Sequence, residues 1–214
     1  VLPADRISPA VVTMPVPHDP DDPAIWYDSG NPESSLIIGT DKDSAGGLYV
    51  FNLSGAVDPA KTVPLDRPNN VDVEYGLELD DASTIDIAAV TVRGTDQIRV
   101  FRLPDMTPVD NGGIDVFVGE TTREPMGIAL YKRNDGAVFA VVSRKSGPSG
   151  SYLWQYELTD DGTGNIIGTK VRGFGLFSGR QEIEAVAVDD ENGYIYYSDA
   201  VSYTHLTLPT KRIV

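Results

Sequence analysis

The chain has 214 residues, enough for one domain with a substantial buried core. It carries 17 Lys and Arg against 32 Asp and Glu, a formal net charge of −15. This balance argues against nucleic acid and against anionic membrane surfaces as partners, because both need a basic binding face. An anionic substrate is still possible if a metal ion lies between it and the acidic protein. There is no cysteine, which excludes disulfides, thiolate zinc sites and a cysteine nucleophile, and no apolar run approaches the ~18 residues of a membrane span.

Strand-like runs follow one another along the chain in pairs joined by polar turns. The pairs are residues 36–39 with 48–53, 85–92 with 98–103, and 137–142 with 152–158. β-Branched and aromatic residues bounded by turn-forming residues predict antiparallel hairpins, and no helical period is sustained. We therefore predict an all-β chain.

The hairpins repeat one another. Each first strand ends at a basic residue, Lys42, Arg93 or Lys145, and these lie 51 and 52 residues apart. Each second strand ends in an aromatic-x-Leu triplet, and another strand-like segment precedes each hairpin. A period near ~50 residues predicts a β-propeller of four-stranded antiparallel blades, and a β-sandwich is disfavoured because these features recur in phase.

The repeat accounts for about three and a half blades, whereas propellers close with roughly four to eight. Residues 201–214 contain no acidic residue, fit no blade and resemble the translation of a sequencing adapter. We interpret residues 1–200 as a partial propeller domain and residues 201–214 as a non-native tail. His205 in that tail is therefore assigned no catalytic role.

Three basic residues are candidates for an anion site. Lys42, Arg93 and Lys145 occupy equivalent strand ends, and the loops at one face of a propeller converge on its axis. Lys and Arg are the residues that bind phosphate, and Arg144 beside Lys145 is a further candidate. Singly, each charge would be interpreted as a solvated strand end, but their recurrence in phase favours a binding site.

A second set of candidates is acidic or carries an amide, and it lies at the start of the first strands. Its members are Asp21, Asp22 and Pro23, then Asn69, Asn70, Val71 and Asp72, then Glu182 and Glu184. Carboxylates, amide oxygens and backbone carbonyls at one rim are the ligands of Ca²⁺. Singly, Asp and Asn before a strand are commonly turn caps. Beside a phosphate site they predict a metal that bridges two acidic partners.

Several motifs in order resemble those of the β-propeller phytases. They lie at residues 21–26, 40–42, 69–75, 144–147, 156–158 and 182–199, and the resemblance covers nearly all of residues 12–200. It implies a six-bladed, calcium-dependent enzyme, secreted or periplasmic and monomeric at full length. Its implied substrate is phytate (myo-inositol hexakisphosphate) as the calcium complex, from which it releases phosphate.

The resemblance also implies a role for each matched residue. Lys42, Arg93 and Lys145 match the cations that hold the scissile phosphate. Calcium ligands are matched by the carboxylates of Asp22 and Glu184 and the carbonyls of Pro23 and Val71, with Asn69, Asn70 and Asp72 shaping that rim. Glu184 is also expected to orient the attacking water. Met126 departs from the family, because some members have a phosphate-contacting Tyr there, and Ala200 stands in place of an acidic ligand.

Two functions of other classes stay open. One is a non-catalytic propeller that binds a ligand or partner across its face, and the other is a Ca²⁺-dependent propeller lactonase. The basic residues favour the phosphatase, since a lactone needs no cluster of cations. We expect the 214-residue chain alone to have little or no activity, because an open propeller has an incomplete channel.

Overall fold

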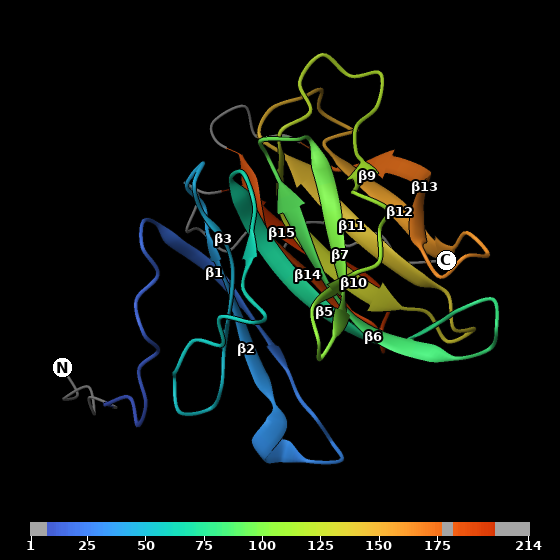
Figure 1. Cartoon of the computed structure of the whole chain (residues 1–214). Coiled ribbons are helices and arrows are strands. Elements are labelled where there is room, and N and C mark those ends of the chain that lie inside the picture. The colour runs from blue at the N-terminus through green and yellow to red at the C-terminus, as the bar shows by residue number, and fades with distance from the viewer. Residues whose placement is uncertain (1–7, 177–181, 200–214) are drawn as a thin grey trace, which may run out of the picture.

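Four antiparallel sheets follow one another in chain order in the computed structural model, which describes residues 8–176 and 182–199 (Figure 1). The first sheet has the order β1 (Pro20–Trp26), β2 (Leu36–Asp41), β3 (Gly47–Phe51), β4 (Val63–Pro64). The second has the order β5 (Pro68–Glu78), β6 (Thr84–Val92), β7 (Gln97–Leu103), β8 (Thr107–Pro108), and β9 (Ile114–Asp115) also pairs with β7.

The third sheet has the order β10 (Pro125–Lys132), β11 (Val138–Arg144), β12 (Leu153–Asp160), β13 (Ile166–Phe174). The fourth contains β14 (Ile183–Asp189) and β15 (Tyr194–Asp199). The one helix of the described residues is a single 3-10 turn, Pro32–Ser34, between β1 and β2. Among these residues no helix has the length and apolar character that crossing a membrane requires.

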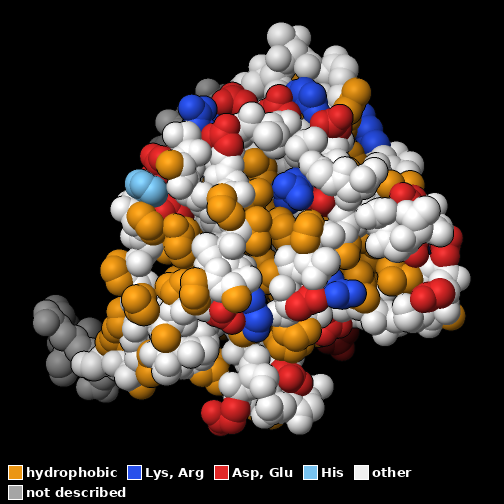
Figure 2. Space-filling view, viewed as in Figure 1, with side chains coloured by type: hydrophobic (Ala, Val, Ile, Leu, Met, Phe, Trp, Pro, Cys, Tyr) orange, Lys and Arg blue, Asp and Glu red, His pale blue; other side chains and the backbone are white. Residues whose placement is uncertain are grey.

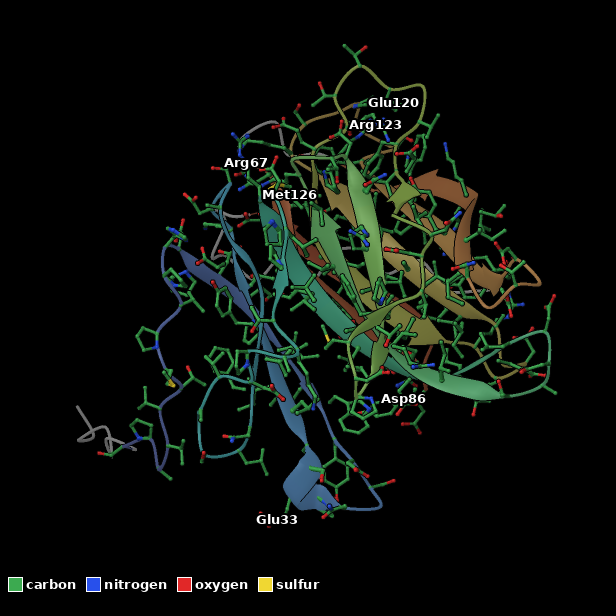
Figure 3. All side chains as sticks on the ribbon, viewed as in Figure 1. Glu33, Arg67, Asp86, Glu120, Arg123 and Met126 are labelled. Carbon is green, nitrogen blue, oxygen red and sulfur yellow. The ribbon has the colours of Figure 1, made fainter. Side chains whose placement is uncertain are left out.

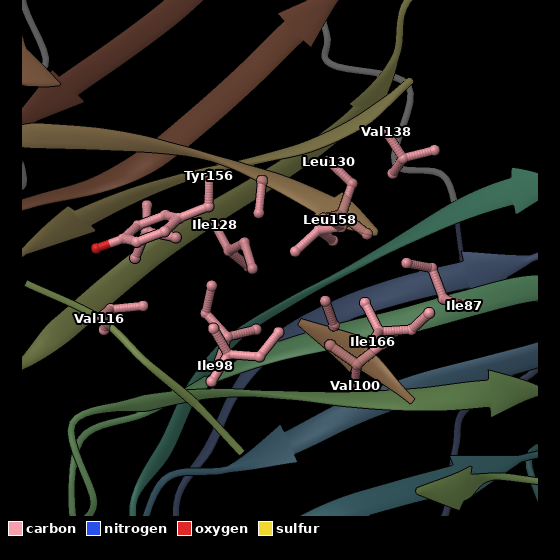
Figure 4. Packing of buried hydrophobic residues seen from close by; sticks show 14 of the residues in the cluster. Ile87, Ile98, Val100, Val116, Ile128, Leu130, Val138, Tyr156, Leu158 and Ile166 are labelled. Atoms are coloured by element: carbon pink, nitrogen blue, oxygen red, sulfur yellow. The ribbon is translucent and has the colours of Figure 1, made fainter. Parts of the chain in front are cut away.

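The hydrophobic core lies between successive sheets. Separate clusters of buried side chains join the first sheet to the second, the second to the third, and the third to the fourth. Figure 4 shows the middle cluster, in which Ile87 and Ile98 of the second sheet meet Ile128 and Tyr156 of the third. The third sheet is covered on both faces, which explains why nearly every residue of β10 and β11 is buried and why these strands are continuous apolar runs.

The first strands of the sheets lie side by side. β5 packs against β1 and β10, and β10 packs against β14, so these four strands line the common centre of the sheets. Sheets that stack face to face in chain order, with their first strands innermost, are the blades of a β-propeller. The predicted fold class is therefore confirmed. Ala200 and the proposed tail, 201–214, lie outside the described residues.

Candidate functional site

The three basic residues predicted to bind phosphate occupy equivalent positions. Each is the first residue after the second strand of its blade, and its backbone N–H donates to the carbonyl before the proline that starts the inner strand. The bonds run from Lys42 to Asp19 (2.9 Å), from Arg93 to Arg67 (3.0 Å) and from Lys145 to Glu124 (3.0 Å). The recurrence seen in the sequence therefore has a structural counterpart in all three blades.

These positions lie at one end of the blades. In Figure 3 Arg67 and Met126 mark that end, and Asp86 lies at the opposite end. Both acidic and basic side chains lie along this edge of the molecule, which is the upper edge in Figure 2. The end that carries the candidate cations is thus mixed in charge although the whole chain is acidic.

Each inner strand carries a β-bulge at this end. In the first three blades two residues of the inner strand stand opposite one residue of the second strand: residues 21–22 face Thr40, 69–70 face Thr91, and 126–127 face Ser143. In the fourth blade the extra residue is Glu184. Bulges redirect side chains next to functional sites, and here they give Asp22, Asn70, Gly127 and Glu184 equivalent places.

Asp22 lies among several of the predicted oxygen ligands. Its carboxylate accepts from the backbone N–H of Val71 at 3.0 Å. Burial is the main cause that raises the pKa of Asp22, hydrogen bonds from Val71 and Asn70 oppose the rise, and the nearby carboxylates of Asp21 and Glu184 add to it. Asp22, Asn70 and Glu184, which come from three different blades, therefore lie in one neighbourhood.

Asp72 lies further along β5 and joins the next inner strand, because its carboxylate accepts from the backbone N–H of Leu130 at 2.7 Å. Burial raises the pKa of Asp72 to about 6. Val71 is buried, whereas Pro23 is exposed. Because Asp72 bonds to a neighbouring inner strand, it also lies near the centre of the blades. The charge of Asp22 is among the causes that raise the pKa of Asp72.

Lys42 joins the acidic neighbourhood. Its Nζ is 2.7 Å from Asp21 Oδ1 and 3.9 Å from Asp19 Oδ2. The hydrogen bond to Asp21 is the main cause that raises the pKa of Lys42, and Glu184 contributes as well. The structure therefore pairs Lys42 with Asp21, the neighbour of Asp22, and Glu184 is among the charges that act on Lys42.

The other two cations are less engaged. Lys145 Nζ is 3.8 Å from Glu182 Oε1, and the Lys145 side chain is 42% exposed. Arg93 Nε is buried and has no hydrogen-bond partner among the described residues. Lys145 therefore has an exposed donor, and Arg93 keeps one donor that the described residues do not pair.

Arg144 has a different environment from its neighbour. It is buried, with Nη1 2.8 Å from Glu120 Oε2, and its guanidinium lies over the rings of Phe117 (4.9 Å) and Trp154 (5.9 Å). These contacts engage its charge within the protein, so we leave Arg144 out of the proposed phosphate site. Met126, which the resemblance marks as a departure from the family, is 1% exposed, and its side chain has no group that donates a hydrogen bond.

Sequence reasoning missed three buried hydroxyls. Thr40, Thr91 and Ser143 each lie two residues before one of the three cations, so a hydroxyl-x-cation pattern recurs in the printed sequence. That pattern was available as a signal, although its meaning depends on which backbone atoms the hydroxyls meet.

The residues at this rim fit a hard cation. Within the part of the chain that the structure describes, no group of three or more His, Cys, Asp or Glu is arranged to hold a metal. The predicted site does not require one, because it combines two carboxylates with amide and backbone oxygens, which Ca²⁺ accepts. In addition, Asn69 is fully buried and its Oδ1 has no partner among the described residues. A buried oxygen acceptor without a donor is consistent with a cation ligand.

Comparison with known proteins agrees with the motif order. The sequence model of the phytase family matches residues 6–206. A protein of Bacillus subtilis (strain 168) described as "3-phytase" is 34% identical over an alignment of 188 residues, and the alignment covers 84% of this chain and 45% of the relative. The chain thus spans about half the length of this relative.

Proposed function

This chain belongs to the phytase family, and on that premise we propose that it is part of a phosphoric monoester hydrolase that releases phosphate from calcium phytate. The observation that carries the proposal is the recurrence of Lys42, Arg93 and Lys145 at equivalent blade positions, with Lys42 paired to Asp21, the neighbour of Asp22. A lactonase gives no reason for three cations at matching places, and membership of the phytase family favours hydrolysis over binding alone.

In this proposal the three cations bind the oxygens of one substrate phosphate and stabilise the negative charge that develops during transfer. Lys42 would exchange its contact with Asp21 for the phosphate, while Arg93 and Lys145 would use donors that are free of strong protein contacts. Glu184 would orient the attacking water as well as serve as a ligand. These are roles in charge stabilisation and positioning, which dominate phosphoryl transfer.

The proposed calcium ligands are the carboxylates of Asp22 and Glu184, the carbonyls of Pro23 and Val71, and the side chain of Asn70, with Asp72 nearby. Bound Ca²⁺ would supply neutralising charge and a lower pKa for a coordinated water. The positive charge of Ca²⁺ would offset the repulsion between these carboxylates. It would also offset their repulsion of the phosphate groups, so that an acidic protein could bind a polyanion.

Phosphate release from calcium phytate, measured on protein from the complete gene, tests the proposal. Arg93→Ala or Lys145→Ala is expected to lower the rate by about 10²–10³-fold, the usual effect of removing a donor to a developing anion. Full activity after exhaustive EDTA treatment would contradict the calcium-dependent mechanism. Hydrolysis of lactones without phosphate release would favour the alternative enzyme class.

The same resemblance supports three further proposals. We expect the protein to act outside the cytoplasm, in the secreted or periplasmic space, and to be a monomer. We also expect the 214 residues alone to release little phosphate. Sedimentation of the full-length protein and assay of the isolated chain test the last two.

A further inference from the structure

The hydroxyls of Thr40, Thr91 and Ser143 make the same pair of contacts in three blades. Each accepts from a bulge N–H of its own inner strand: Asp22 (2.9 Å), Asn70 (3.1 Å) and Gly127 (2.9 Å), respectively. Each donates to a carbonyl of the next inner strand: Asn69, Met126 and Ile183, respectively. Every one of these hydroxyls therefore joins two neighbouring blades at the level of the bulges.

A hydroxyl can satisfy both atoms at such a point with one short side chain. An N–H from one blade and a C=O from the next are buried together, and a hydroxyl donates and accepts at once. The second strand has one residue opposite the two bulge residues. The side chain of that one residue bonds to the inner strand of its own blade and to the inner strand of the next blade. Valine in its place would leave two buried backbone groups unpaired, and the bulges would have to move to find water.

The bulges held in this way carry the proposed ligands. Thr40 holds the N–H of Asp22 and the carbonyl of Asn69, the residue before Asn70. Ser143 holds the carbonyl of Ile183, the residue before Glu184. A shift of either bulge would therefore change the spacing of oxygens that come from different blades.

We propose that the hydroxyls of Thr40 and Ser143 are positioning residues for the cation-binding oxygens of Asp22, Asn70 and Glu184. The identity of the ligand rests on the proposed function. Metal sites depend on partners that orient their ligands, and loss of such a partner typically weakens binding by ~10–100-fold.

Calorimetric titration of the metal-free chain with Ca²⁺ tests the role of Thr40. Thr40→Val keeps the shape of the side chain and removes the hydroxyl, and it is expected to weaken Ca²⁺ binding by ~10-fold or more. Thr40→Ser restores the hydroxyl and is expected to bind close to wild type. Ser143→Ala is expected to weaken binding in the same way.

Trp26→Phe is a matched control for lost stability. Trp26 Nε1 donates to Asp86 Oδ2 at 2.9 Å across the same pair of blades, but at the opposite end, where Figure 3 labels Asp86. This variant also loses one hydrogen bond between blades, so it is expected to lower the unfolding midpoint without changing Ca²⁺ affinity. If Thr40→Val lowers the midpoint but binds Ca²⁺ as tightly as Trp26→Phe does, the hydroxyl is merely structural and the proposal is overturned.

Hydrogen exchange without metal separates this inference from the proposed function. The N–H of Val71 donates to the Asp22 carboxylate, so its exchange rate reports where that carboxylate lies. Faster exchange at Val71 in Thr40→Val, but not in Thr40→Ser or Trp26→Phe, supports the positioning role. Unchanged exchange overturns it. A wild-type chain that binds no Ca²⁺ would contradict the proposed function, while the exchange result would still decide the role of Thr40.

Discussion

Arg144 and Lys145 are adjacent in the sequence but belong to different environments. Arg144 is buried against Phe117 and Trp154 and paired with Glu120, while Lys145 is half-exposed at the blade end. Arg144→Ala is therefore expected to destabilise the fold by about 3 kcal/mol, because it removes a buried ion-pair partner and leaves a cavity. Lys145→Ala should change stability by less than about 0.5 kcal/mol.

Urea unfolding of both variants, together with phosphate release by full-length protein, checks this pair. Lys145→Ala should lose activity at unchanged stability. The opposite pattern, in which Lys145→Ala unfolds easily and Arg144→Ala does not, would show that the two side chains have been assigned the wrong environments.

Asp41 is a buried carboxylate that anchors the segment leading to Asp21 and Asp22. Burial by itself would raise the pKa of Asp41, but N–H donors from His18, Asp19 and Asp43 and the His18 ring hold it below the usual value. A lowered pKa in the fold means that the ionised group adds stability above the unfolded pKa of about 3.9. That stability is lost as the pH falls through the folded-state pKa.

Asp41→Asn is therefore expected to cost on the order of 1–3 kcal/mol at pH 7, because an amide nitrogen would face hydrogen-bond donors. The difference from wild type should narrow below about pH 4. Denaturant titrations at several pH values measure this, and a difference that stays constant down to pH 3 would refute it.

At the scale of elements, the inner strands approach one another so closely that one position must be glycine. A Cβ atom on Gly127 of β10 would overlap the carbonyl oxygen of Glu184 in β14. Gly127→Ala should push the two strands apart and destabilise the fold by about 1–3 kcal/mol, as overpacking does. Calcium affinity should fall as well, because Glu184 moves.

Thermal unfolding and Ca²⁺ titration of Gly127→Ala check this prediction, with Gly136→Ala as the control. Gly136 has a positive φ of 93° but no atom near its Cβ position. It should therefore lose stability through backbone strain and keep its calcium affinity. If both variants bind calcium equally tightly, the close packing of β10 on β14 at Gly127 does not determine the position of Glu184 for calcium binding.

The elements that could be predicted are those with a strong apolar signal. The hairpins and inner strands are runs of β-branched and aromatic residues, and the structure confirms them. By contrast, β4, β8 and β9 have two residues each, too few for any periodicity. β13 is an edge strand, mostly exposed, so its sequence has little apolar alternation.

The candidate site divides along similar lines. The equivalence of Lys42, Arg93 and Lys145 follows from their spacing alone, and the backbone contacts agree with it. The burial of Arg144 depends on Trp154 of the neighbouring strand β12 and on Phe117 of the loop after β9, and the sequence does not show that these two rings meet at Arg144. The hydroxyls two residues before each cation were visible, but their two backbone partners appear only once the blades are placed.

For the whole molecule, the net charge of −15 and the proposed calcium site make opposite contributions to stability. Repulsion among acidic groups destabilises the compact state, and any salt relieves part of it. A ligand that binds only the folded state adds a further RT ln(1 + [L]/Kd), which is about 2.7 kcal/mol at 100 times Kd. For a chain of this size that corresponds to a rise of roughly 5–10 °C in the unfolding midpoint.

Thermal unfolding in CaCl₂ and in NaCl of equal ionic strength separates the two contributions. The wild-type midpoint should rise more in CaCl₂ than in NaCl. In Asp22→Asn combined with Glu184→Gln the excess should disappear while the NaCl response persists, since the other acidic groups remain and still repel. Superimposed curves for the two salts in the wild-type chain would mean that its acidity is surface charge alone, and that the rim formed by the inner strands holds no calcium.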